Sequence, residues 1–123
     1  MGTFSMLIVM LSIIGTAYAS SYSTSYRFSV SVTGATRYFD GSNITFTSPY
    51  ASSTPWKNNL NKTYNVVLYR DRIIDDYIGT VTLYRDESGT ANWNNVGAGN
   101  YYFILSKVND GVTLVDNKVT IKN

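Results

Sequence analysis

The chain of 123 residues contains no cysteine and no histidine, and its ten Lys and Arg residues outnumber its eight Asp and Glu residues to give a formal net charge of +2. The two missing residue types exclude disulfide bonds, cysteine catalysis, the Ser-His-Asp triad and a conventional zinc site. Positive and negative residues alternate along the chain, so the basic patch of a nucleic-acid-binding protein is missing, and we expect no nucleic-acid partner.

The first 19 residues have the pattern of a cleaved secretory signal peptide. An apolar run over residues 6–14 is interrupted only by Ser12, and the small residues Ala17 and Ala19 follow it at the spacing that signal peptidase requires. Cleavage is expected after Ala19. The run is shorter than the roughly 20 residues of a membrane-spanning helix, so the mature form is predicted to have no transmembrane helix and to be secreted. No Lys or Arg precedes the run; if residues 1–19 were retained, they would tether the chain to a membrane.

The mature chain is predicted to be a single domain. Residues 20–25 are polar and low in complexity, which predicts a flexible lead-in. Residues 26–123 have the length of one domain. Small secreted domains of eukaryotes usually depend on disulfide bonds, so an exported chain without cysteine indicates a bacterial source.

Short segments with alternating apolar and polar residues, rich in aromatic and β-branched side chains, predict an all-β domain. The expected strands are residues 26–33, 44–47, 64–70, 78–85, 90–93, 100–107, 112–115 and 119–121. Asn109-Asp110-Gly111 predicts a hairpin, and the last two strands are expected to form a closing hairpin. Seven or eight short antiparallel strands separated by turns predict an immunoglobulin-like β-sandwich, with a small barrel as the alternative.

Three sequence runs resemble the core of prealbumin-like and collagen-adhesin B-type domains. They are Val81 to Gly89, Trp93 to Val96, and Gly99 to Phe103. Domains of these families are secreted or surface β-sandwiches that often serve as stalks or binding modules. The resemblance implies that Tyr101 fills the core beside Gly99. The chain is also similar in general appearance to small uncharacterised secreted proteins of Gram-positive bacteria.

Residues 48–62 are the least regular part of the domain and contain both prolines. This segment is expected to be a long loop or an edge excursion, and it carries Tyr50 and Trp56. Exposed aromatic rings on a β-sandwich stack on sugar rings or anchor protein interfaces. We therefore predict Tyr50 and Trp56 as ligand-binding residues.

Asp71, Asp75 and Asp76 cluster in one turn, and oxygen ligands in sandwich loops suit Ca²⁺. Calcium is the one cofactor that the sequence suggests. In the alternative interpretation the turn is solvated and is neutralised by Arg70 and Arg72.

The remaining acidic residues also lie in predicted turns, where aspartates usually bond to the local backbone. With no catalytic constellation, the chain is not expected to be an enzyme. The favoured function is a secreted, non-catalytic binding module for an extracellular protein, a glycan or a cell wall. A structural subunit that polymerises through strand edges is the first alternative, and a secreted antimicrobial or inhibitor is the second.

Overall fold

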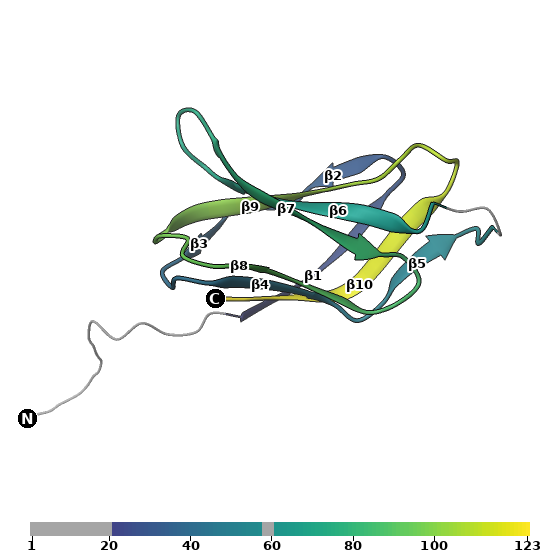
Figure 1. The fold of residues 1–123 in the computed structure, drawn as a ribbon, viewed down its shortest axis with the longest axis horizontal. Coiled ribbons are helices and arrows are strands. Elements are labelled where there is room, and N and C mark those ends of the chain that lie inside the picture. Colours follow the sequence, from purple (N-terminus) through teal and green to yellow (C-terminus); the bar gives the residue numbers. More distant parts are fainter. Residues whose placement is uncertain (1–20, 58–60) are drawn as a thin grey trace, which may run out of the picture.

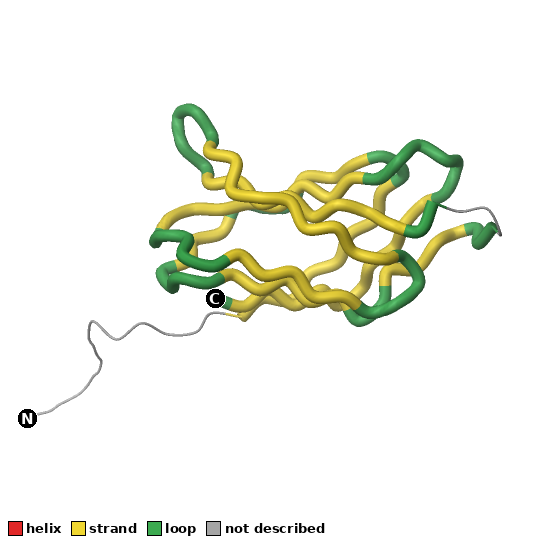
Figure 2. Tube along the Cα trace, viewed as in Figure 1, coloured by secondary structure: helices red, strands yellow, loops and turns green. Residues whose placement is uncertain are grey.

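A computed structural model describes residues 21–57 and 61–123. The predicted cleavage-site residues Ala17 and Ala19 lie outside the described residues. Among those that are described, all regular structure is β-strand, arranged in two layers with the loops gathered at the two ends (Figure 2). The described residues form ten strands: β1 (Ser21–Phe28), β2 (Ser31–Thr33), β3 (Arg37–Phe39), β4 (Ile44–Ser48), β5 (Ala51–Thr54), β6 (Thr63–Arg70), β7 (Asp76–Tyr84), β8 (Gly89–Trp93), β9 (Gly99–Ser106) and β10 (Thr113–Lys122).

Each layer is a five-stranded antiparallel sheet, so the predicted all-β sandwich is confirmed (Figure 1). Sheet A has the order β1-β10-β4-β8, with β5 also paired to β10. Sheet B has the order β2-β9-β6-β7, with β3 also paired to β9. The short strands β4 and β5 pair with consecutive stretches of β10, and β2 and β3 do the same with β9. The pair β4 and β5 therefore takes the place of one interrupted strand beside β10, and the pair β2 and β3 takes the place of another beside β9.

The strand order is that of a jelly roll, in which two Greek keys wrap around one core. In an immunoglobulin fold the first two strands lie side by side in one sheet. Here β1 and β2 lie in different sheets, and the first strand pairs with the last. The observed β-sandwich therefore differs in connectivity from the immunoglobulin type that was predicted from the sequence.

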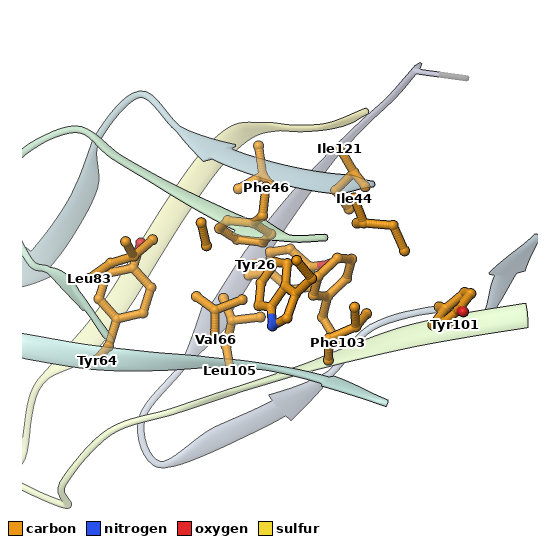
Figure 3. Packing of buried hydrophobic residues seen from close by; sticks show 14 of the residues in the cluster. Tyr26, Ile44, Phe46, Tyr64, Val66, Leu83, Tyr101, Phe103, Leu105 and Ile121 are labelled. Atoms are coloured by element: carbon orange, nitrogen blue, oxygen red, sulfur yellow. The ribbon is translucent and has the colours of Figure 1, made fainter. Parts of the chain in front are cut away.

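The core lies between the sheets and is rich in aromatic side chains (Figure 3). Phe46 from sheet A and Phe103 from sheet B meet across it with ring centroids 5.4 Å apart, and Trp93 lies 5.6 Å from Phe103. Tyr101 is 1% exposed, as expected. Aromatic pairs at these separations add stability beyond the apolar area that they bury.

The predicted flexible lead-in is wrong from Ser21 onward, because these residues form the first half of β1. Tyr22 packs edge-on against Phe39 with ring centroids 5.6 Å apart, and the backbone pairs with β10. The serines between the tyrosines face outward, which explains why the segment appears polar and simple in sequence.

Two further elements differ from expectation at the end of the chain. The residues of the expected closing hairpin form a single strand, β10, which contains a bulge at Lys118, where φ is 60°. A bulge bends a strand without reversing it. The expected hairpin at Asn109-Asp110-Gly111 is instead a connection between the two sheets, since β9 lies in sheet B and β10 in sheet A.

Candidate functional site

A pocket of about 230 Å³ opens at one end of the sandwich, where the segment after β5, the approach to β6 and the β7–β8 turn meet. Two aromatic side chains line it while remaining largely open to solvent: Trp56 is 64% exposed and Tyr84 is 56% exposed. Charged side chains of both signs complete the lining: Lys57, Lys62, Arg85, Asp86 and Glu87. We call this the aromatic pocket.

The β7–β8 turn that forms one wall is fixed to β5. Asp86 adopts a φ of 60°, and its amide donates to the carbonyl oxygen of Ala51 at 2.6 Å. Its carboxylate accepts two hydrogen bonds from Ser53, one from the amide at 2.9 Å and one from the hydroxyl at 2.8 Å. The Asp86 carboxylate thus holds the wall in place, and Glu87 remains an exposed carboxylate in the lining.

A buried ionic cluster adjoins the aromatic pocket through Arg85, which is one of the lining residues. Arg85 and Lys107 have side chains only 1% and 0% exposed, and both bind the carboxylate of Asp110, at 2.7 Å and 2.8 Å. Arg85 also donates to the carbonyl oxygen of Thr63 through Nε. Its Nη2 is buried and has no hydrogen-bond partner among the described residues. The cluster places two cations against one carboxylate and so biases this end of the molecule toward positive charge.

Burial alone would raise the pKa of Asp110. Hydrogen bonds from Lys107 and Arg85, together with their positive charges, outweigh burial and hold the pKa of this carboxyl well below its usual range. Asp110 is therefore ionised at neutral and mildly acidic pH.

Of the two aromatic residues singled out in the sequence, the structure places only Trp56 in the aromatic pocket. Trp56 follows the cis Thr54–Pro55 peptide at the end of β5. Tyr50 is 52% exposed but lies between β4 and β5, and it is not among the described residues that line the pocket. Tyr84 was missed, although the alternation of its strand, with Leu83 inward, indicates an outward position for it.

The turn proposed for calcium forms the tip of the β6–β7 hairpin, which projects beyond the body of the sandwich (Figure 1). Asp75 accepts a hydrogen bond from the backbone amide of Arg72 at 2.9 Å and another from the hydroxyl of Tyr102 at 2.6 Å. These two bonds lower the pKa of Asp75, that from Tyr102 contributing most. Asp76 pairs with the guanidinium of Arg72 at 3.0 Å. No three His, Cys, Asp or Glu side chains of residues 21–57 and 61–123 converge as metal ligands.

We call residues 71–76 the finger. Its tip carries two apolar side chains with almost no contacts of their own, since Ile73 is 104% exposed and Ile74 is 84% exposed. At its base, Tyr102 of the neighbouring strand β9 stacks on Tyr69 of β6, with ring centroids 5.4 Å apart. The finger thus presents two isoleucines on a loop that is held in shape by hydrogen bonds, an ion pair and stacked rings.

Comparison with protein families, with curated proteins and with solved structures finds no significant match to this chain. In the part of the chain that the structure describes, no helix is long and apolar enough to cross a membrane.

Proposed function

We propose that this chain is a secreted, non-catalytic binding module that holds a glycan in the aromatic pocket. A single observation carries the proposal: Trp56 and Tyr84 both line one pocket of about 230 Å³ and leave more than half of their surface free. The C–H faces of sugar rings pack on such aromatic faces, and their hydroxyl groups bond to polar side chains around them.

The charged groups around the two rings support a sugar as the ligand. Lys57 and Lys62 offer donors and Glu87 offers an acceptor at the edge of the same pocket. A sugar hydroxyl both donates and accepts hydrogen bonds, so a rim of mixed character suits it better than a rim of one sign. The rigid attachment of the β7–β8 turn to β5 lowers the entropic cost of binding.

Affinity electrophoresis of the purified protein in gels that contain soluble bacterial cell-wall polysaccharides tests the proposal. Retardation of the parent protein and its loss in Trp56→Ala and Tyr84→Ala are expected. Tyr38→Ala is the matched control, because Tyr38 is 55% exposed and lies on β3, outside the pocket lining. Equal retardation of Trp56→Ala and the parent would remove the aromatic pocket from consideration.

A second function, assembly into a matrix or surface layer, is favoured by a different observation. Two neighbouring isoleucines that are almost fully exposed on a projecting loop are rare on a protein that works as a monomer, because contiguous exposed apolar surface marks an interaction site. The finger rather than a strand edge is the contact element in this version of the assembly hypothesis.

A further inference from the structure

We propose that the finger of one copy of this protein docks in the aromatic pocket of a second copy, so that the molecules join head to tail. The inference goes beyond glycan binding and does not depend on it. It rests on the shape, the charge and the positions of two surfaces within one chain.

The two surfaces are complementary in shape and polarity. The finger projects from the sandwich and exposes the aliphatic side chains of Ile73 and Ile74, whereas the aromatic pocket is a hollow lined by the rings of Trp56 and Tyr84. Aliphatic groups pack well against aromatic faces. The hydrogen bonds to Asp75 hold the finger in shape before it binds, which reduces the entropy lost on docking.

The two surfaces are also complementary in charge. The finger carries three aspartates and one arginine, which is a formal excess of negative charge. The pocket lining carries three cations and two carboxylates, and the Lys107–Asp110 pair below it adds no net charge. Complementary charge of this kind orients partners and speeds their encounter. The same three aspartates oppose insertion of the finger into a lipid bilayer, where carboxylates are costly.

The positions of the two surfaces require a second copy. The finger ends at Asp76, which is the first residue of β7, and Tyr84 is the last residue of β7, so the finger and Tyr84 lie at opposite ends of a nine-residue strand. At about 3.3 Å per residue they are separated by roughly 26 Å, and Figure 1 shows the finger and β5 at opposite ends of the sandwich. A finger therefore cannot reach the pocket of its own chain. A contact between two different surfaces is heterologous, and it builds open chains or rings.

Sedimentation velocity of the purified protein from micromolar to millimolar concentration tests the inference. Species larger than dimers are expected to form as the protein concentration rises. They should dissociate at high salt, because salt screens the charges of the two surfaces. The finger variant Ile73→Ser/Ile74→Ser and the pocket variant Trp56→Ala are each expected to remain monomeric. All three positions are exposed, so the fold is not at risk. Val30→Ser, at an exposed valine outside both surfaces, should assemble like the parent.

A mixture of the two variants gives the sharpest result. The finger variant retains a pocket and the pocket variant retains a finger, so together they should form a one-to-one dimer that grows no further. A parent protein that stays monomeric at millimolar concentration would overturn the inference. So would a finger variant that assembles like the parent, or a monomeric parent that binds neutral lipid vesicles through Ile73 and Ile74.

Glycan retardation of the finger variant separates this inference from the proposed function. Because its pocket is intact and no finger competes for it, this variant should bind polysaccharide at least as strongly as the parent does, even though assembly is lost. Assembly that persists in a protein with no polysaccharide binding would support docking and contradict the glycan proposal alone.

Discussion

The indole Nε1 of Trp93 in β8 donates a hydrogen bond of 3.1 Å to the carbonyl oxygen of Gly79 in β7. The two residues belong to different sheets, so this bond joins the edges of the sandwich on one side. A Cβ at Gly79 would lie 3.3 Å from the indole, which shows how closely the ring approaches the opposite backbone.

Replacement of Trp93 by Phe should lower the free energy of unfolding by about 2–3 kcal/mol. The change removes the only donor of the Trp93 side chain, leaves the Gly79 carbonyl without this partner, and vacates part of a tightly packed site. Urea denaturation followed by circular dichroism measures the loss. Trp56→Phe is the control at an exposed tryptophan and should shift stability by no more than about 0.5 kcal/mol. Equal midpoints for the two variants would contradict the structural role of the bond.

The buried carboxyl of Asp116 should make the domain less stable as pH rises from about 4 to about 6. Burial raises the pKa of Asp116 to about 6, although hydrogen bonds from Ser48 and Tyr64 partly offset that effect. An unfolded aspartate has a pKa of about 3.9. Between these values the folded state keeps a proton that the unfolded state has lost. Stability therefore falls with rising pH, by about 3 kcal/mol in total from this group.

Asp116→Asn isolates this contribution, because the amide occupies the same space and does not ionise. The variant should match the parent near pH 4 and exceed its stability by about 2–3 kcal/mol near neutral pH. Urea denaturation across this pH range gives the difference between the two proteins. A constant difference at all pH values would mean that Asp116 ionises as easily in the folded state as in the unfolded state.

The carboxylate of Asp110 should be far more important to stability than its partial exposure suggests. Asp110→Asn leaves the buried cations of Arg85 and Lys107 without a counter-charge, and the expected cost is about 3–5 kcal/mol. Lys107→Met keeps the Arg85 pair and should cost less. Since the pKa of Asp110 is depressed, its contribution is present above about pH 4 and is lost as the medium becomes strongly acidic. Asp40→Asn, at an exposed aspartate, is the control and should change little.

Gly111 should tolerate a side chain poorly, because its φ of 74° lies in the left-handed region. Gly111→Ala is expected to cost about 1–2 kcal/mol. Gly97→Ala is the matched control, since its Cβ would make only an ordinary contact of 3.5 Å with Arg70. Thermal melts of both variants check the difference, and equal melting temperatures would argue against strain at Gly111.

The alternation of side chains predicts several strands well but does not show where the chain changes sheets. The pattern from Tyr26 to Thr33 continues without a break, yet β1 and β2 lie in different sheets and Val30, between them, is 47% exposed. Tyr26 and Phe28 face the core as expected. The alternation of side chains reflects only the extended local backbone. The passage of the chain from sheet A to sheet B is determined by the distant strands with which it pairs, β10 for β1 and β9 for β2.

The buried ionic cluster beside the aromatic pocket could not be predicted from the sequence, for a similar reason. Arg85 and Lys107 stand at strand ends, where charged residues are normally solvated, and both are buried here. Their shared partner Asp110 comes from a turn 25 residues after Arg85. Only the fold brings these groups together. The exposure of Trp56, in contrast, could be predicted from its proline-bearing segment.

The central place of β10 in sheet A sets the order in which the domain can fold. This last strand pairs with β1 on one side and with β4 and β5 on the other. Pairing the first strand with the last closes nearly the whole chain, which makes folding slow. While the chain is still being synthesised, sheet A stays open until residues 113–122 emerge. A chain that stops just before Thr113 would keep the hairpin of β6 and β7 but would lack the strand around which sheet A is built.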